Sequence, residues 1–286
     1  MTTSRILRRF LASAAFMLPL TAAADKLTSL PGIQLYSLRS QFKLRGVDWT
    51  LDQVKAHGIT TVELASGIPD IPIPELTEKL KARGLTAVSS HFGYKRYKED
   101  LDGIVKDAKA LGIQFAGCAW IDHKDTFDEA ECRDAIATFN RAGEALAKEG
   151  IKFFYHFHGF EFQPFGEGTL FDLFMQETNP QYVFAQMDVL WIVFPGRDPV
   201  KLLEQHPGRW VLSHLKDLKK GVATGSLTGH TDVNNNVPLG QGQVDWKAFF
   251  KAASNAGVQY HFIEDESDSV LLQLPQHIEY LKNLEW

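Results

Sequence analysis

One combination of polar and apolar positions recurs five times along this chain. Each copy has the polar end of a helix, then glycine, then an apolar residue that opens a β-type run: KAHGI (55–59), KARGL (81–85), KALGI (109–113), AKEGI (147–151) and SNAGV (254–258). Glycine directly after a helix adopts the left-handed conformation of the C-cap without strain, so a strand can start at once. Repeated helix-to-strand units of this kind predict a mainly parallel sheet.

Eight runs have the length and composition of buried strands. They cover residues 32–36, 60–65, 86–92, 113–119, 151–158, 182–188, 210–216 and 259–264. Most successive runs start 26 to 38 residues apart, which is the length of one βα unit. An open doubly wound sheet usually has a glycine-rich phosphate turn after its first strand, and GIQLYSLRS at 32–40 has none. The pattern therefore predicts one α/β domain, a single (β/α)8 TIM barrel over residues 25–286.

The first 24 residues have the pattern of an export signal. A basic start with three arginines precedes an apolar run from Phe10 to Leu20, and small residues at 21–24 suit a cleavage site before Asp25. The apolar run is shorter than the roughly 20 residues that cross a bilayer, and no later segment approaches that length. We therefore expect a cleaved signal peptide at 1–24, a periplasmic or secreted protein, and no membrane attachment after cleavage.

The net charge of the chain limits the classes of molecule that it is expected to bind. Without residues 1–24 the chain has 27 Lys and Arg against 35 Asp and Glu, a formal net charge of −8. Such a chain has no basic stripe to neutralise phosphates, which argues against nucleic-acid binding. The two cysteines, Cys118 and Cys132, either pair in an oxidising compartment or remain buried thiols. We expect a small-molecule partner, and a homodimer is compatible with the sequence.

Polar side chains gather where the later strands end, although the strands themselves are apolar. In chain order they are His156, His158 and Glu161 after the fifth run, Asp188 after the sixth, His214 and Lys216 after the seventh, and Glu264 after the eighth. Earlier runs add Gln34, Tyr36, Glu63 and His91. In a TIM barrel the functional site lies at the carboxyl ends of the strands, so these side chains should meet there.

A set of Glu, Asp, His and Glu offers three hard oxygens and one nitrogen with three negative charges. It suits Mn2+, Mg2+, Co2+ or Zn2+. Each residue alone would be ordinary, because an Asp after a strand is usually a helix cap and a strand His is usually a core residue. Four of them on four consecutive strand ends predict a site for one divalent ion, with Mn2+ as the first candidate.

The motifs that hold these residues resemble the xylose isomerase-like TIM-barrel family of sugar phosphate isomerases and epimerases. They are GIQLYSLR, TTVELASG, YHFHGFEF, QMDVLW followed by GRDPV, GRWVLSHLKD, PLGQGQVDW and FIEDES. The resemblance extends over nearly all of residues 31–286. It implies a divalent ion held by Glu, Asp, His and Glu after strands five to eight, which carries over to Asp188, His214 and Glu264. Many relatives have a glutamate within strand five, where this chain has Tyr155 and His156, so Glu161 is the expected fourth ligand and His156 the alternative.

The resemblance also implies a reaction. In relatives the ion acts on a ketose carbonyl and stabilises an enediolate, while two glutamates move protons on opposite faces of the sugar. Glu161 and Glu264 would be that pair, with His158 as a further proton-transfer group and His91, His156, Lys216, Gln34 and Glu63 as substrate-binding residues. A metal-dependent isomerase or epimerase of carbohydrates is the leading hypothesis. A lyase acting on a keto-glycoside or sugar acid and a non-catalytic carbohydrate-binding barrel are the alternatives.

The expected export bears on the substrate, because phosphorylated sugars are largely cytoplasmic. A non-phosphorylated sugar or keto-sugar is therefore expected. The Gly- and Asn-rich segment 217–245 is either a lid over the barrel mouth or a disordered insertion.

Overall fold

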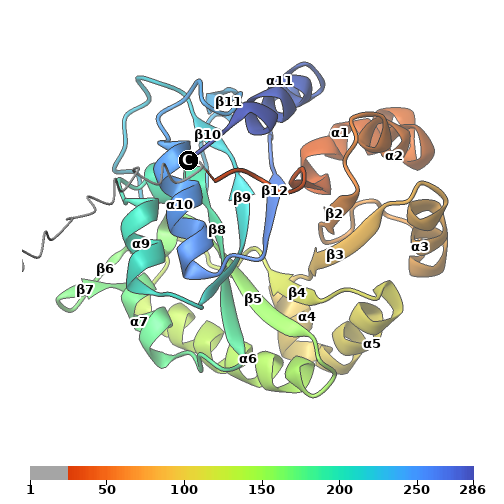
Figure 1. Cartoon of the computed structure of the whole chain (residues 1–286). Helices are drawn as coiled ribbons and strands as arrows, with labels where there is room; N and C mark the ends of the chain where they lie inside the picture. The colour runs from red at the N-terminus through yellow and green to blue at the C-terminus, as the bar shows by residue number, and fades with distance from the viewer. Residues whose placement is uncertain (1–24) are drawn as a thin grey trace, which may run out of the picture.

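The computed structural model describes residues 25–286; the predicted export signal at 1–24 lies outside the described residues. Eight parallel strands close into a barrel in the order β1–β12–β9–β8–β5–β4–β3–β2, with the helices around the outside (Figure 1). The barrel strands are β1 (Gly32–Gln34), β2 (Thr61–Leu64), β3 (Thr86–His91), β4 (Phe115–Cys118), β5 (Lys152–Phe157), β8 (Val183–Asp188), β9 (Trp210–Leu215) and β12 (Tyr260–Ile263). The predicted (β/α)8 barrel is confirmed.

Helices follow the strands along the chain and cover the barrel from outside. They are α1 (Arg39–Arg45), α2 (Val47–Ala56), α3 (Ile73–Ala82), α4 (Tyr94–Glu99), α5 (Leu101–Leu111), α6 (Glu129–Ala147), α7 (Leu170–Glu177), α8 (Val189–Val193), α9 (Pro199–Gln205), α10 (Trp246–Ala256) and α11 (Val270–Asn283). The five glycines of the recurring unit all have φ between +67° and +85°. The sequence pattern therefore marks real helix-to-strand turns. Among residues 25–286, no helix combines the length and apolar character needed to cross a bilayer.

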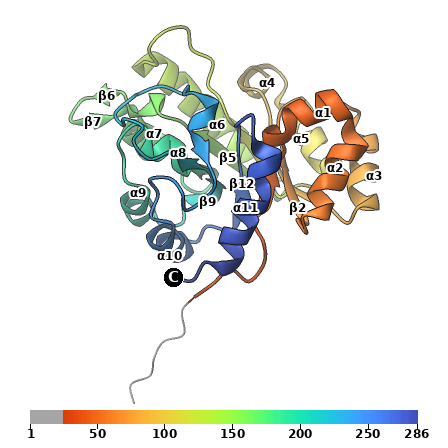
Figure 2. The same ribbon diagram turned by 90° about the horizontal axis from the view of Figure 1, so that it is seen from above.

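The first and last parts of the described chain lie side by side and close the ring (Figure 2). Strand β1 pairs in parallel with both β2 and β12. Asp25 and Trp286 exchange two backbone hydrogen bonds, of 2.8 and 2.9 Å. The barrel is therefore sealed by the pairing of its first and last strands, as the predicted strand order requires.

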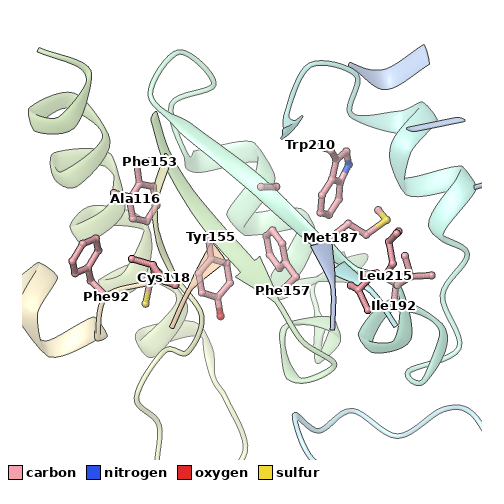
Figure 3. Packing of buried hydrophobic residues seen from close by; sticks show 14 of the residues in the cluster. Phe92, Ala116, Cys118, Phe153, Tyr155, Phe157, Met187, Ile192, Trp210 and Leu215 are labelled. Carbon is pink, nitrogen blue, oxygen red and sulfur yellow. The ribbon is translucent and has the colours of Figure 1, made fainter. Parts of the chain in front are cut away.

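Successive residues of each barrel strand face opposite sides. On β5, Phe153, Tyr155 and Phe157 project outward and pack under the helices (Figure 3). Tyr155 stacks on Phe139 of α6, with ring centres 5.2 Å apart. The intervening residues face the barrel interior, because side chains alternate along a strand.

The interior of the barrel is apolar at its amino-terminal end and polar at its carboxyl end. Phe154, Leu212 and Phe262 belong to one buried apolar cluster. Two residues further along the same three strands stand the predicted site residues His156, His214 and Glu264, so one face of each strand supplies first a packing residue and then a polar one. Gly117 on β4 lies against the ring of Phe154, where a Cβ atom would come within 2.3 Å of it.

The segment 217–245 contains a small antiparallel pair, β10 (Asp217–Leu218) with β11 (Asn236–Val237), which closes the loop 219–235. Asp217 fixes the segment, because its buried carboxylate accepts hydrogen bonds from the backbone N–H groups of Gly240 (2.9 Å), Gly242 (3.1 Å) and Val244 (3.2 Å). The indole N–H of Trp246, at the start of α10, donates a fourth at 2.9 Å. One carboxylate therefore anchors residues 240–246 to the end of β9.

We predict that Asp217→Ala lowers the free energy of unfolding by about 3 kcal/mol, because it leaves several buried donors without an acceptor. Urea unfolding followed by circular dichroism measures the change. Asp70→Ala is the matched control, since Asp70 is exposed and should change the stability by less than about 0.5 kcal/mol. Equal effects of the two substitutions would contradict the anchoring role of Asp217.

Candidate metal and substrate site

A cavity of about 470 Å3 opens at the carboxyl ends of the barrel strands. It is the place where the predicted site residues come together. Those that line it are Gln34, Tyr36, His91, His156, His158, His214 and Glu264. Asp188, Lys216 and Glu63 are also buried at this end of the barrel, although they do not line the cavity themselves.

Three of the four predicted metal ligands converge. Asp188, His214 and Glu264 each offer a ligand atom, and these atoms all lie within 4.8 Å of one another. Nδ1 of His214 is 2.8 Å from Oε2 of Glu264 and 3.8 Å from Oδ2 of Asp188. Asp188 also caps helix α8, because its Oδ1 accepts the backbone N–H of Trp191 at 3.1 Å. Its second oxygen is left for the site.

The unpaired atoms of this group fit a divalent cation. Oδ2 of Asp188 is buried and has no hydrogen-bond partner among residues 25–286, and Nδ1 of His214, although only 2.8 Å from Oε2 of Glu264, makes no well-directed hydrogen bond to it. A buried polar atom without a partner is costly, and two such atoms beside a third carboxylate are accounted for by an ion that binds all three. The donor set of two carboxylates and one imidazole suits Mn2+, Co2+, Mg2+ or Zn2+.

Lys216 neutralises the acidic groups of the site. Its Nζ lies 3.5 Å from both Asp188 and Glu264 and bonds to Glu266. Burial opposes ionisation of Glu264, but Lys216 and His214 outweigh it and hold the pKa of that carboxyl well below its ordinary range. Lys216 is thus a partner of the carboxylates at the base of the site and does not line the cavity; its contact with substrate stays a prediction.

Glu63 lies beneath the site and has no exposed surface. Its carboxylate accepts hydrogen bonds from Gln34 (2.7 Å), Ser89 (2.5 Å), Gln186 (2.8 Å) and His214 (2.5 Å). Burial disfavours its charge, yet His91 and His214 hold the pKa of Glu63 below the ordinary value. The oxygens of Glu63 are taken by these donors and it does not line the cavity, so it holds the surrounding polar side chains in place; its role as a substrate-binding residue stays a prediction.

Gln186 is a site residue that the sequence analysis missed. It stands on β8, fully buried, two residues before Asp188 and on the same face. Its side-chain oxygen lies 2.9 Å from Nε2 of His91 and 3.1 Å from Nδ1 of His156. The period-two alternation that placed Asp188 in the site would also have found Gln186.

The second group that the sequence missed is aromatic. Trp120 and Trp191 line the cavity, and His158 lies between them, with ring centres 5.2 and 5.5 Å away. Gly229, His230 and Thr231 of the segment 217–245 also line the cavity, and His230 lies against Trp120. The segment therefore covers part of the mouth, as the lid interpretation expects.

Glu161 is not brought to the other predicted ligands. Its carboxyl accepts the O–H of Tyr155 at 2.5 Å and the backbone N–H of His158 at 3.0 Å. Because Tyr155 faces outward under the helices, this bond holds Glu161 away from the cavity. Burial raises the pKa of Glu161 to about 8. In this geometry Glu161 does not reach the other predicted ligands, whereas the alternative ligand, His156, lines the cavity; the assignment of Glu161 as metal ligand and acid–base group stays a prediction.

Both cysteines are buried and free, so they do not form a disulfide. Burial raises the pKa of each thiol to about 12. They are structural residues.

We predict that Asp188→Ala abolishes binding of the ion, whereas Glu161→Gln retains it. The first substitution removes a converging ligand atom, and the second changes a carboxyl that has other partners. Elemental analysis after dialysis against Mn2+ gives the stoichiometry, with about one equivalent expected in the wild type and in Glu161→Gln. Loss of the ion in Glu161→Gln, with the fold intact by circular dichroism, would restore Glu161 as a ligand.

We also predict that Glu161 makes the fold more stable at acid pH. The carboxyl has an ordinary value of 4.5 and a folded value of about 8, so the folded state binds the extra proton between these pH values. Its contribution is fully present below pH 4.5 and is lost as the pH rises through 8. The stability difference between wild type and Glu161→Gln, measured by urea unfolding from pH 5 to 8.5, should shift against the wild type as the pH rises. A constant difference would contradict the buried, protonated carboxyl.

Sequence relatives of known activity are similar over part of their length. An inosose dehydratase from Geobacillus thermodenitrificans is 32% identical over 158 residues, 52% of this chain and 52% of that protein. One from Geobacillus kaustophilus is 30% identical over 203 residues, 62% of this chain and 65% of that protein. The chain thus spans between about half and two thirds of these relatives' length.

Solved structures share the barrel over most of both chains. A sugar phosphate isomerase/epimerase from Parabacteroides distasonis superposes with a TM-score of 0.72 at 23% identity, over 89% of this chain and 98% of that one. The IOLI protein with a bound zinc atom gives 0.66 at 15% identity, over 87% and 94%. At these identities the likeness shows the fold. The model of the xylose isomerase-like TIM barrel matches residues 51–286, and the chain belongs to that family.

Proposed function

We propose that this protein is a metal-dependent enzyme that removes a proton next to a carbonyl group of a sugar or cyclitol and then eliminates the neighbouring hydroxyl as water. The observation that supports it is the group of Asp188, His214 and Glu264, which converge with two unpaired buried atoms at the base of a polar cavity. The inosose dehydratase relatives suggest a keto-cyclitol or keto-sugar as the substrate class.

Asp188, His214 and Glu264 would hold the ion, with His156 as the fourth candidate ligand. Mn2+ is the first candidate, and the zinc of the IOLI structure makes Zn2+ the second. When bound, such an ion polarises a carbonyl of the substrate and stabilises the negative charge that develops on its oxygen.

The cavity has the composition of a sugar site. Trp120 and Trp191 offer apolar surface for the C–H groups of a ring, whereas Gln34 and Asn236 offer amides to its hydroxyls. About 470 Å3 accommodates a ring of six atoms with its substituents.

Proton removal falls to His158. It lines the cavity between the two tryptophans, and burial lowers its pKa well below the ordinary value, so the ring is neutral and can accept a proton. In an elimination the C–H bond breaks, a C=C bond forms, and the C–O bond to the β-hydroxyl breaks as water leaves. One base can serve both steps on one face of the ring, by passing the proton it has taken to the leaving hydroxyl.

Epimerisation begins with the same proton removal but needs a second group on the opposite face. The resemblance assigned that pair to Glu161 and Glu264. Because Glu161 is bonded to Tyr155 and faces away, the two-glutamate arrangement is not formed by the described residues. This favours elimination over the two-glutamate epimerase reaction expected from the sequence.

We predict that the Mn2+-loaded protein converts 2-keto-myo-inositol to a product lighter by one water, with deuterium uptake from D2O. His158→Asn should retain the ion but lose turnover by about 100-fold or more, whereas Glu264→Gln should lose both. Glu279→Gln, on the exposed face of α11, is the matched control. Mass spectrometry and NMR follow the product.

The products of this experiment distinguish elimination from isomerisation or epimerisation. Deuterium uptake without loss of water would show an isomerase or epimerase. If a panel of free keto-sugars and keto-cyclitols gives neither exchange nor elimination although the ion is bound, the enzymatic proposal fails and the carbohydrate-binding alternative remains.

We further propose that residues 1–24 direct export, which would expose the enzyme to non-phosphorylated substrates. Amino-terminal sequencing of protein recovered from the periplasm should begin at Asp25. Recovery of the uncleaved chain from the cytoplasm alone would contradict this.

A further inference from the structure

In each hydrogen bond to Glu63 the carboxylate is the acceptor and its partner is the donor. An ionised carboxylate only accepts hydrogen bonds, so each group bonded to it must donate. Gln186 lies with its Nε2 2.8 and 3.1 Å from the two oxygens of Glu63, which fixes the orientation of its amide. His214 bonds the same carboxylate through Nε2 at 2.5 Å, so that nitrogen bears a proton.

The fixed amide of Gln186 decides what its oxygen can do. With Nε2 turned to Glu63, Oε1 is the atom that meets His91 and His156, at 2.9 and 3.1 Å. An amide oxygen accepts and never donates, and it has two lone pairs for the two rings. Nε2 of His91 and Nδ1 of His156 must therefore both bear protons.

These protons determine which nitrogen of each histidine ring keeps a lone pair. A neutral imidazole has one protonated nitrogen, so a proton at one position leaves a lone pair at the other. His156 then has its lone pair on Nε2, and His91 has its lone pair on Nδ1. His214, protonated at Nε2, turns Nδ1 toward the carboxylates of Glu264 and Asp188, 2.8 and 3.8 Å away, so a cation bound there would take the place of a proton on Nδ1.

We infer that Glu63 and Gln186 are positioning residues that set the tautomers of three histidines, so that His156 presents Nε2 and His214 presents Nδ1 as lone pairs to the site. Glu63 acts on His214 directly and on His91 and His156 through Gln186. Neither Glu63 nor Gln186 lines the cavity, so their effect on substrate or ion passes through the rings.

The arrangement matters because the opposite tautomer would turn an N–H bond toward a cation or toward the proton to be removed. Groups that orient a ligating histidine from behind typically change metal affinity by 10- to 100-fold when they are removed. The effect on affinity rests on the proposed metal site, whereas the tautomers themselves do not. An experiment can therefore contradict the proposed metal site without contradicting the tautomers, and the reverse.

The decisive measurement is nitrogen NMR of histidine-labelled protein, which distinguishes protonated from unprotonated ring nitrogens. In metal-free wild type at neutral pH, His156 should be protonated at Nδ1 alone and His91 at Nε2 alone. In the Zn2+-loaded protein, His214 should keep its proton at Nε2. Single His→Gln variants assign the signals.

Gln186→Met should release His91 and His156 into tautomer mixtures and lower the Zn2+ affinity by about 10- to 100-fold. Gln34→Met is the matched control: Gln34 donates to Glu63 at 2.7 Å in the same way but has no hydrogen bond to a histidine. The control should leave the tautomers of all three rings unchanged.

Two results would overturn the inference. One is a proton on Nε2 of His156 in the wild type, a measurement that needs no folded variant. The other is an unchanged tautomer of His156 in a folded Gln186→Met protein. If the tautomers behave as expected but no ion binds, the positioning network stands and the proposed metal site is what fails.

Discussion

The carboxylate of Glu63 is the constraint on which the site depends. A charge without exposed surface is tolerated only when its oxygens are filled by good donors, because an unpaired ion in a low-dielectric interior is expensive. Here the donors come from β1, β3, β8 and β9. Only a closed barrel brings strands so far apart in the chain around one point. The same closure that removes the sheet edges therefore also surrounds a buried anion with hydrogen-bond donors.

The sequence was sufficient for the parts that follow from strand periodicity. Parallel strands present their carboxyl ends at one edge, and alternation fixes which side chains face inward, so Asp188, His214 and Glu264 could be placed together without knowledge of any loop. The left-handed glycines gave the helix-to-strand turns for the same reason, since their conformation is local. The eight strands of the barrel were found within a few residues of their bounds.

Residues whose placement depends on the direction of a turn, or on how deep they lie in the barrel, could not be predicted from strand periodicity. Glu161 follows β5 within a 3-10 turn (Phe160–Phe162), where no period predicts direction, and the hydroxyl of Tyr155 turns it outward. Glu63 has the inward face that was expected, but a linear pattern does not report that its neighbours would fill its oxygens. Trp120 lies in an irregular segment after β4 and carried no periodic signal. The depth of a side chain and the direction of a turn are set only in the assembled barrel.

Strand β9 and the residue pair after it place His214, Lys216 and Asp217 within four successive positions. His214 and Lys216 lie in the site inside the barrel, and Asp217 anchors the segment 217–245, which covers part of the barrel mouth. A one-residue insertion here would exchange the faces of the strand and disturb the ligand, its counter-charge and the anchor together. Between the anchor and β11, by contrast, residues 219–235 contact the loops at the carboxyl end of the barrel: the N–H of Gly225 donates to the carbonyl of Phe194 at 2.8 Å, and the side chain of Gln163 donates to the carbonyl of Leu227 at 3.3 Å. These contacts are made to loops and not to barrel strands, so this part of the chain can vary in length and composition without a change in strand register. Substrate preference in this branch of the family could therefore change by exchange of one covering segment, and a graft of residues 219–235 between relatives is a natural route to altered specificity.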